Sequence, residues 1–570
     1  MFEWSALAQF SSSKAQDALV EDLLAQKAAS RIHKKDASLY NFSHSAEISA
    51  QNFMGWTDLA SCPPYSLDEI KDLADELISE GLERVVLIGE GGSSQAAMTL
   101  SKVFSQENSD IRFSTLDSLS PLYMHRIMAD IDIEKAVIIV SSKSGTTLET
   151  SSMARIIWDF ASSVLGEERA AKRFIVITDP NTRMHKLALE RGYRAVFLGE
   201  PSVGGRFSAL SVFGLVPAAL IGMDIHKLIE NAARMEERCS QDNADNPGLQ
   251  LAAFLFANVS IESAHAFSYL SPQPGRVLGL WIEQLVAESL GKNGKGIVPQ
   301  IAIDPKLLNP PYPVRPVLLH TMEYCCSPMY DCDLLDASVP CARFCIEGAY
   351  DLGAYFVMWE YAVAMLGYLL GVDPFNQPDV AEAKTNSSRA LHGLLPYEAK
   401  ALKEDWLIAE ASDYFYGQEF ESLDEILDMM FESTREGDWV SINAFLPFTG
   451  DRRAPLENIR YTMAKHLALP VCLEIGPRYL HSTGQLHKGG PNTGIFFTLS
   501  ASEDDDILVP GESHSLSDIM IAQSKGDLYT LSQRGRRAIH LHLENNHPET
   551  LIKLADAFER AAQRSSTKAK

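Results

Sequence analysis

Four short runs of consecutive apolar residues between residues 84 and 200 constrain the fold of this chain more than any other feature. They read RVVLIG, KAVIIVSS, RFIVITD and RAVFLGE, and they alternate with helical stretches such as SSQAAMTLSKVF and TTLETSSMARIIWDFA. Strands that are apolar along their whole length are buried on both faces, and helical crossovers between them make the strands parallel. This region is therefore predicted to form a parallel sheet covered by helices on both faces.

A second group of strand-like runs follows the polar stretch ERCSQDNADNPG, whose charge and Pro-Gly ending are typical of a domain boundary. These runs (QIAID, RFCIE, WVSINAFL, PVCLEIG, GIFFTLS and AIHLHLE) predict a second sheet completed late in the chain. The predicted fold class is α/β, with two three-layer αβα domains, parallel-rich sheets and a helical N-terminal segment. The expected bounds are 1–55 for that segment, 56–240 for the first domain, 246–560 for the second domain with a C-terminal extension, and 561–570 for a disordered tail.

Composition and charge exclude several classes of protein. No uninterrupted apolar run reaches the roughly 20 residues that a membrane span requires. The first 30 residues lack the basic start and apolar stretch of a signal peptide, so a cytoplasmic location is expected. The formal net charge of −25 disfavours nucleic acid and anionic membranes as partners. An anionic substrate would therefore need a locally positive pocket.

The sequence predicts neither a metal nor a nucleotide cofactor. Five of the eight cysteines cluster in one segment (Cys325, Cys326, Cys332, Cys341 and Cys345), but no C-x-x-C pair occurs, and ordinary reduced thiols are expected. The run Gly89-Glu90-Gly91-Gly92-Ser93-Ser94 after the first strand lets backbone N–H groups approach an anion. However, Ser94 replaces the third glycine of a dinucleotide fingerprint, and no clear acidic ribose-binding position follows.

A hydroxyl-rich loop follows the next strand: Ser142-Lys143-Ser144-Gly145-Thr146-Thr147-Leu148-Glu149-Thr150. One interpretation is a helix N-cap at Thr146 with Glu149 completing a capping box. The loop carries more hydroxyls than capping needs, which favours phosphate binding at the helix N-terminus. The two loops resemble those of the sugar isomerase (SIS) domain superfamily, and SKSGTTLET is similar to the S-K-T-x-T-T-x-E-T run of phosphoglucose isomerases. The predicted phosphate-binding residues are Gly92, Ser93, Ser142, Lys143, Ser144 and Thr147.

Two further segments resemble catalytic motifs of that family. Gly204-Gly205-Arg206-Phe207-Ser208 is similar to G-G-R-[YF]-S, which implies that Arg206 stabilises the charge of an enediolate. A predicted helix ends in Glu288-Ser289-Leu290-Gly291-Lys292, similar to E-S-x-G-K, which implies that Glu288 is the catalytic base. Glu283 on the same helix is an alternative, and without the resemblance either glutamate would be interpreted as a solvated helix residue.

The ring-opening groups are expected in two later segments. The run from Asp373 to Lys384, DPFNQPDVAEAK, resembles N-x-F-D-Q-x-G-V-E-x-x-K, which assigns ring opening to Lys384. The loop LHSTGQLHKGGPNTG resembles the isomerase half of bifunctional transaldolase/phosphoglucose isomerases and makes His481 the predicted ring-opening histidine, with Gln485 and His487 as further substrate-loop residues. In the family this histidine usually lies between the glutamate and the lysine, an interval that here contains His320, in an apparent strand.

The resemblance, from KDASLY and GWTDL to GRRAIHLHLE, implies an enzyme that interconverts glucose 6-phosphate and fructose 6-phosphate through a cis-enediolate, a step of glycolysis and gluconeogenesis. Mannose 6-phosphate is an alternative substrate, and the resemblance allows a homodimer. Transaldolase activity is not expected, because too few residues precede position 35 for its barrel. The alternatives are a non-catalytic phosphosugar sensor and a glucosamine 6-phosphate synthase. The chain shows neither a helix–turn–helix nor an N-terminal cysteine nucleophile in support of them.

Overall fold

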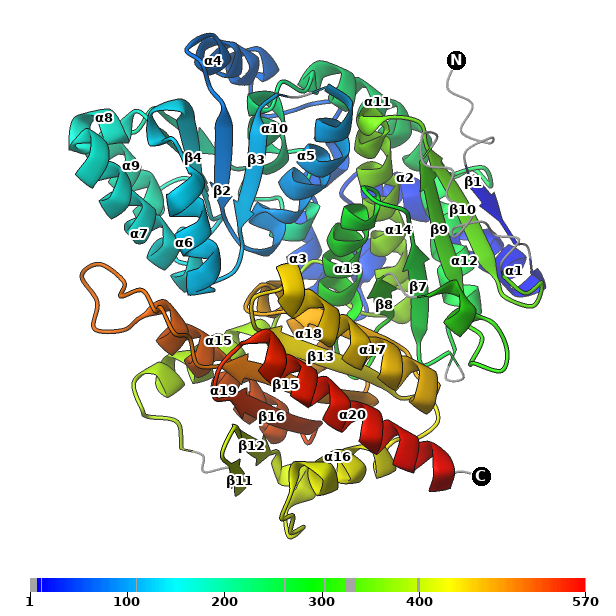
Figure 1. Ribbon diagram of the computed structural model, residues 1–570. Coiled ribbons are helices and arrows are strands. Elements are labelled where there is room, and N and C mark those ends of the chain that lie inside the picture. The colour runs from blue at the N-terminus through cyan, green and yellow to red at the C-terminus, as the bar shows by residue number, and fades with distance from the viewer. Residues whose placement is uncertain are drawn as a thin grey trace.

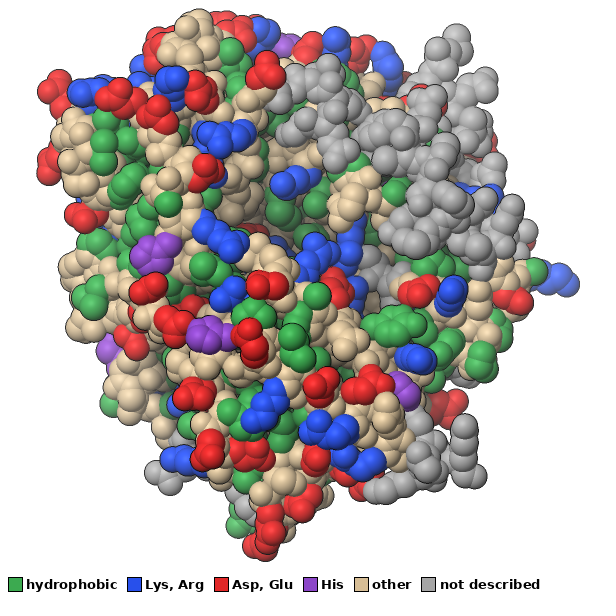
Figure 2. Space-filling view, viewed as in Figure 1, with side chains coloured by type: hydrophobic (Ala, Val, Ile, Leu, Met, Phe, Trp, Pro, Cys, Tyr) green, Lys and Arg blue, Asp and Glu red, His purple; other side chains and the backbone are tan. Residues whose placement is uncertain are grey.

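Three sheets and the helices around them make up the computed structural model (Figure 1). The structure describes residues 8–11, 13–108, 110–260, 263–301, 304–322, 335–396 and 400–568. Figure 2 shows acidic side chains spread over one face, with Lys and Arg side chains around a hollow near its centre. The mixed α/β class and the parallel-rich sheets are as predicted.

The first sheet is fully parallel, with strand order β3-β2-β4-β5-β6. Val85 and Leu87 of β2 pack into one hydrophobic core, whereas Val86 and Ile88 pack into another, so both faces are covered as the continuous apolar runs predicted. Its strands are β2 (Arg84–Ile88), β3 (Arg112–Leu116), β4 (Ala136–Ser141), β5 (Phe174–Thr178) and β6 (Ala195–Leu198). The helices of this region are α4 (Leu67–Ser79), α5 (Gln95–Asn108), α6 (Pro121–Asp130), α7 (Leu148–Leu165), α8 (Glu167–Ala171), α9 (Arg183–Arg191) and α10 (Val212–Leu220).

The second sheet has the order β1-β10-β9-β7-β8, with only the edge strand β1 antiparallel. The N-terminal segment is therefore not helical throughout, because β1 adds to the edge of this sheet. The strands are β1 (Ala8–Phe10), β7 (Ala266–Leu270), β8 (Val298–Ile301), β9 (Val317–Met322) and β10 (Cys341–Ile346). The helices are α1 (Lys14–Ala25), α2 (Ala28–His33), α3 (His44–Phe53), α11 (Ile225–Cys239), α12 (Pro247–Asn258), α13 (Arg276–Leu290) and α14 (Leu352–Leu370).

The third sheet has the order β11-β12-β16-β15-β13-β14, with β11 and β12 antiparallel to their neighbours. Its strands are β11 (Lys400–Glu404), β12 (Leu407–Ala411), β13 (Trp439–Phe445), β14 (Val471–Ile475), β15 (Gly494–Ala501) and β16 (Arg537–Leu543). The helices are α15 (Val380–Leu391), α16 (Leu423–Glu432), α17 (Arg453–Leu467), α18 (Gly484–Gly489), α19 (Leu516–Gln533) and α20 (Pro548–Lys568).

The prediction of one second sheet is therefore wrong: its strand runs are divided between the second and third sheets. An apolar run shows that a strand is buried but carries no information about which strand it pairs with. The predicted disordered tail is also wrong as far as Lys568, because α20 continues to that residue. One face of α20 is buried against the third sheet through Leu551, Leu554 and Phe558. This packing stabilises the helix, which extends beyond these residues.

Helix α14 is the central helix of the core. Within the described part of the chain, residues 349–370 are long and apolar enough to cross a membrane, and 89% of the most apolar stretch is buried inside the protein. Phe356 of α14 is completely buried and packs at 4.7 Å, ring centroid to ring centroid, against Trp281 of α13. Since α13 also carries Glu288, the packing of α14 helps to position a predicted site residue.

Replacing Phe356 with alanine should therefore destabilise the protein by about 3–5 kcal/mol, because a large buried ring would leave a cavity beside Trp281. The midpoint of urea unfolding, followed by tryptophan fluorescence, measures the change. Leu189→Ala is the matched control, since Leu189 is 63% exposed and should cost no more than about 0.5 kcal/mol. Equal midpoints for the two variants would contradict this account of the core.

Candidate active site

Loops from the first sheet and from later segments meet at one place. Glycines at this place allow the backbones of the loops to come into direct contact. A Cβ on Gly92 would lie 2.1 Å from the carbonyl oxygen of Gly205, so the loop after β2 rests directly on the loop that carries Arg206. A Cβ on Gly91 would lie 2.7 Å from the carbonyl oxygen of His481. The predicted glycine-rich loop thus packs against two of the other predicted motifs.

The hydroxyl-rich loop presents an open helix N-terminus. Thr147 is the N-cap of α7, but no side chain caps the helix there, so the first N–H groups of an 18-residue helix remain available to an anion. Ser142 Oγ lies 3.0 Å from Thr147 Oγ1, and the turn between them is made by Gly145 in the left-handed region, with φ of +64°. The capping box that Thr146 and Glu149 could have formed is absent from this loop, because the Glu149 carboxylate binds elsewhere.

Three of the predicted phosphate-binding residues have individual roles in the structure. Lys143 Nζ donates to both carboxylate oxygens of Asp179 and to the carbonyl of Glu200, so all three of its N–H donors already have partners. Ser144 is exposed and accepts from the amide and hydroxyl of Thr146. Ser93 is buried, and its carbonyl oxygen accepts from the hydroxyl of Ser141. The loop offers hydroxyls and N–H groups, whereas the charge of Lys143 is neutralised.

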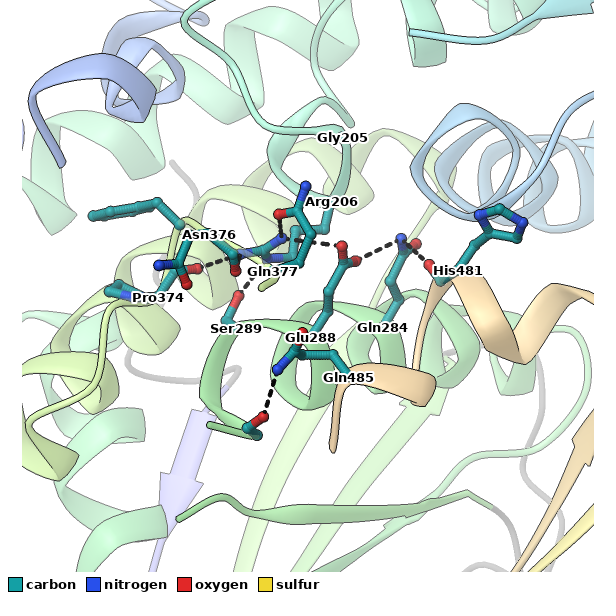
Figure 3. A network of polar contacts seen from close by, with 12 residues as sticks. Gly205, Arg206, Gln284, Glu288, Ser289, Pro374, Asn376, Gln377, His481 and Gln485 are labelled. Atoms are coloured by element: carbon teal, nitrogen blue, oxygen red, sulfur yellow. Dashed lines mark hydrogen bonds and ion pairs between the residues drawn. The ribbon is translucent and has the colours of Figure 1, made fainter. Parts of the chain in front are cut away.

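The Arg206 guanidinium is the most heavily coordinated group of the site (Figure 3). The side chain is only 2% exposed, and Nη1 lies 3.2 Å from Oε1 of Glu288, in the last turn of α13. The remaining contacts go to Ser289 Oγ at 2.7 Å, Gln377 Oε1 at 3.1 Å, and the carbonyls of Pro374 at 2.6 Å and Asn376 at 3.0 Å. Burial lowers the pKa of Arg206, but an arginine in a protein stays charged. The structure thus places a permanent positive charge against Glu288.

Gln284 links Glu288 to the histidine loop. It lies one helical turn before Glu288, and its Nε2 donates to Glu288 Oε2 at 3.1 Å and to the carbonyl of His481 at 2.9 Å (Figure 3). The predicted base and the predicted ring-opening histidine are therefore joined by one side chain. The helical spacing of four residues is the sequence signal that could have identified Gln284.

The His481 side chain pairs with a carboxylate of the hydroxyl-rich helix. Nε2 of His481 lies 2.9 Å from Oε1 of Glu149, and Nε2 of Gln523 donates to the same oxygen at 2.6 Å. Burial by itself would raise the pKa of Glu149, but the charge of His481 and these hydrogen bonds lower it to about 2. Glu149 is therefore a carboxylate that orients His481. Sequence reasoning considered Glu149 only as a capping residue and missed Gln523, which no local motif marks.

Lys384 joins this pair in one pocket. A pocket of ≈ 320 Å³ is lined by Thr146, Thr147, Glu149, Lys384, His481 and Gln523, among others. The lysine is exposed on α15, and the volume is in the range of small-ligand sites. The hydroxyl-rich loop and both predicted ring-opening groups thus share one pocket. Glu288 and Arg206 are not part of its lining and connect to it through Gln284.

The other two histidines considered from the sequence are enclosed by the fold. Burial lowers the pKa of His487 far below its ordinary value, and its ring packs among Trp439, Tyr479 and Phe496. His320 lies completely buried in β9, where burial lowers its pKa to about 3. Neither ring faces an open pocket, so both have packing roles.

Gln485 is also buried, and it holds two loops together rather than facing the pocket. Its Nε2 donates to the carbonyl of Gly291 and to Asp379, and its Oε1 accepts from the Asp379 amide. The expected substrate-loop role of Gln485 stays a prediction. Of the clustered cysteines, Cys341 and Cys345 lie in β10, whereas Cys325, Cys326 and Cys332 lie outside the described residues. The described residues include no group of three metal-ligating side chains.

Comparisons with known proteins give matches to phosphoglucose isomerases. The profile of phosphoglucose isomerase matches residues 67–301. A glucose-6-phosphate isomerase of Mycoplasmopsis pulmonis is 30% identical over 427 residues, which cover 66% of this chain and 97% of that protein. One from Limosilactobacillus reuteri is 32% identical over 390 residues, or 59% of this chain and 85% of that protein.

Two solved structures share the fold. A hypothetical protein from Thermus thermophilus superposes with a TM-score of 0.55 and 23% identity, covering 66% of this chain and 96% of that one. A glucose-6-phosphate isomerase from Chlamydia trachomatis superposes with a TM-score of 0.54 and 17% identity, covering 68% and 89%. The two structures show the fold, and the relative that is 30% identical and matched over 97% of its length, with the profile match, shows that the chain belongs to the phosphoglucose isomerase family.

Proposed function

We propose that this protein is a glucose-6-phosphate isomerase, an enzyme that interconverts glucose 6-phosphate and fructose 6-phosphate. The observation that carries the proposal is the contact of Arg206 with Glu288, joined by Gln284 to the His481 loop. Aldose–ketose isomerisation needs a base and a fixed positive charge at the carbon atoms that react, and a second acid/base group at the ring oxygen. The chain supplies all three within one connected network.

The proposed reaction begins with the phosphate at the N-terminus of α7. The phosphate oxygens are held by the hydroxyls of Ser142, Ser144 and Thr147 and by the open N–H groups of the helix. The loop of Gly92 and Ser93 contributes as well. This anchoring leaves the sugar carbons to extend toward the rest of the site. Lys143, whose donors are occupied by Asp179 and Glu200, contributes by shaping the loop.

Ring opening and proton transfer follow. His481, oriented by Glu149, donates a proton to the ring oxygen with Lys384 beside it in the same pocket, and the C1 hydroxyl loses its proton as the ring bond breaks. Glu288 then takes the proton from C2, which yields a cis-enediolate, and returns it to C1 to give the ketose. The proton on the C2 oxygen is lost as the new carbonyl forms, and the C1 oxygen gains one. Arg206, 3.2 Å from Glu288, stabilises the negative charge of the intermediate.

One chain supplies every group of this mechanism, so the homodimer allowed by the resemblance is not needed to complete the site. We also propose a cytoplasmic location. In its support, Cys62, Cys239 and Cys472 are free thiols, as expected for a reducing compartment.

Replacing Glu288 with glutamine should lower kcat by roughly 10²–10⁴-fold with KM little changed, because a general base is lost while substrate contacts remain. Formation of glucose 6-phosphate from fructose 6-phosphate, coupled to glucose-6-phosphate dehydrogenase, measures the rate, and a parallel assay with mannose 6-phosphate tests the alternative substrate.

Glu283→Gln is the matched control on the same helix. Burial raises the pKa of Glu283 well above its usual value, so a neutral amide imitates its protonated form and activity should persist. Near-normal turnover by Glu288→Gln, or loss of activity only in Glu283→Gln, would contradict the assignment of Glu288 as the base.

Removing the Gln523 amide should weaken ring opening. Gln523→Ala is expected to lower kcat by about 10- to 100-fold, the equivalent of about 1.5–3 kcal/mol for a hydrogen bond to a charged group. Because this hydrogen bond helps to lower the pKa of Glu149 to about 2, its loss should raise that pKa. Glu149 would then lose its charge at a higher pH, and the acid limb of the kcat profile should move upward.

The kcat of Gln523→Ala is measured across the pH range in the same coupled assay. Lys525→Ala provides the control, since Lys525 lies two residues away on α19 and is exposed. An unchanged acid limb in Gln523→Ala would show that Gln523 does not act through Glu149.

A complementation experiment tests whether the site is formed by one chain. Glu288→Gln and His481→Ala are each expected to be nearly inactive, and co-expression of the two should yield no more activity than the sum of the separate variants. If His481 instead acts on the neighbouring subunit, mixed dimers would contain one intact site, and the activity of the co-expressed sample would rise well above that sum.

A further inference from the structure

A second pocket lies beside the phosphate loop, and the proposed reaction does not use it. It has a volume of ≈ 350 Å³ and is formed by α7, α9 and the ends of β4 and β5. The two helices lie side by side on one face of the first sheet (Figure 1), where Met153 and Met184 share a hydrophobic core. Of its lining residues only Thr146 also lines the pocket of His481 and Lys384, so the two pockets are separate spaces that share a wall.

The inner surface of the second pocket is apolar. Val140 and Val176, which are 3% and 1% exposed, contribute from the strands, and Met184 and Leu187 contribute from α9. Tyr193 adds an aromatic wall whose ring stacks on Phe174 with centroids 5.2 Å apart. This surface can contact the body of an aromatic or aliphatic molecule but offers few partners to the hydroxyls of a sugar.

Three arginines, Arg155, Arg183 and Arg191, also line this pocket. Arg155 of α7 pairs with Glu512, from the loop between β15 and α19. Among the described residues, Arg183 and Arg191 of α9 form no ion pair within 4.0 Å of a carboxylate, although the charge of Arg183 helps to lower the pKa of Glu512, the partner of Arg155. Arg191 is held in place, because its guanidinium carbon lies 4.2 Å from the centre of the Trp158 ring and its Nη1 donates to the Tyr193 hydroxyl at 3.0 Å.

Two unpaired guanidinium groups at one apolar pocket are unexpected in a chain with a formal net charge of −25. The many carboxylates of the protein could neutralise them, yet Glu512 is the only one paired to an arginine of this pocket in the described chain. Guanidinium groups bind carboxylates and phosphates through paired N–H donors, and they do so more strongly beside low-dielectric walls. The arrangement therefore favours the binding of an anion that is not part of the protein.

We propose that this pocket binds a small molecule that carries a carboxylate or phosphate on an apolar, preferably aromatic, body. The anionic group pairs with Arg183, at the first position of α9, and the body lies against Val140, Val176 and Tyr193. A sugar phosphate lacks the apolar body and is not a ligand of this pocket. The proposal does not depend on the isomerase reaction, because it rests on different residues and a different cavity.

Binding is tested by isothermal titration calorimetry with 3-phenylpropionate and with phenyl phosphate, and 3-phenylpropanol is the uncharged control. A saturating equilibrium mixture of glucose 6-phosphate and fructose 6-phosphate is present throughout, so that the phosphate loop is occupied. At least one anionic probe should bind and the alcohol should not. The probe that binds more tightly identifies the preferred anionic group.

Variants then locate the binding site. Arg183→Glu should weaken the binding of the anionic probe by about tenfold or more, because a charge-assisted hydrogen bond is replaced by repulsion. Leu187→Asp should also weaken the binding of the probe, because it places a negative charge in the apolar wall of the pocket. Both side chains are exposed, so the fold tolerates the changes. Arg238→Glu, at an exposed arginine of α11 remote from this pocket, should bind like the unmodified protein. Absence of binding by both anionic probes, or wild-type affinity in both pocket variants, would overturn the proposal.

Discussion

The buried charge of Arg206 is the constraint on which the rest of the site depends. A guanidinium that is 2% exposed has lost its hydration, and the protein must replace that hydration with acceptors placed around it. Those acceptors come from Glu288 and Ser289 at the end of α13 and from the turn of Pro374, Asn376 and Gln377. One side chain of the first-sheet region therefore holds two distant segments in position. A lysine could not replace it, because a single ammonium cannot reach acceptors in so many directions.

Close backbone contacts also hold the loops of the site together, in addition to the hydrogen bonds of Arg206. Gly92 lies against the carbonyl of Gly205, and Gly91 lies against the carbonyl of His481, so any side chain at either glycine would push the loops apart. Gln284 crosses the same junction and binds both Glu288 and the His481 carbonyl. Chemistry that needs a base and an acid on one substrate is sensitive to small displacements. Glycine contacts and buried hydrogen bonds hold such a geometry better than exposed side chains can.

Sequence reasoning succeeded where the information was local. Continuous apolar runs predicted the first sheet, and the motifs of Arg206, Glu288 and His481 marked segments that the fold does bring together. It failed where information was non-local: nothing near Gln523 predicts a contact with Glu149, 374 positions away along the chain. Likewise, apolar strands indicate burial without naming their partners, so two sheets were taken for one. His487 resembled a ligand-loop residue, but its burial depends on Trp439 and Phe496, which lie far apart in the sequence.

For the predicted ring-opening histidine, too, order along the chain differs from position in the fold. His320 lies in the interval between the base and the lysine, where the resemblance would place the ring-opening group, yet it is buried in the middle of β9. His481 comes after both, in the turn that follows the carboxyl end of β14, and that turn brings its ring to Glu149 on α7. A proton-transfer group needs a partner that orients it and an open path to the substrate, and both are properties of position in space. The order of Glu288, Lys384 and His481 along the chain is therefore compatible with one site, because each segment ends at the junction that Arg206 and Gln284 hold together.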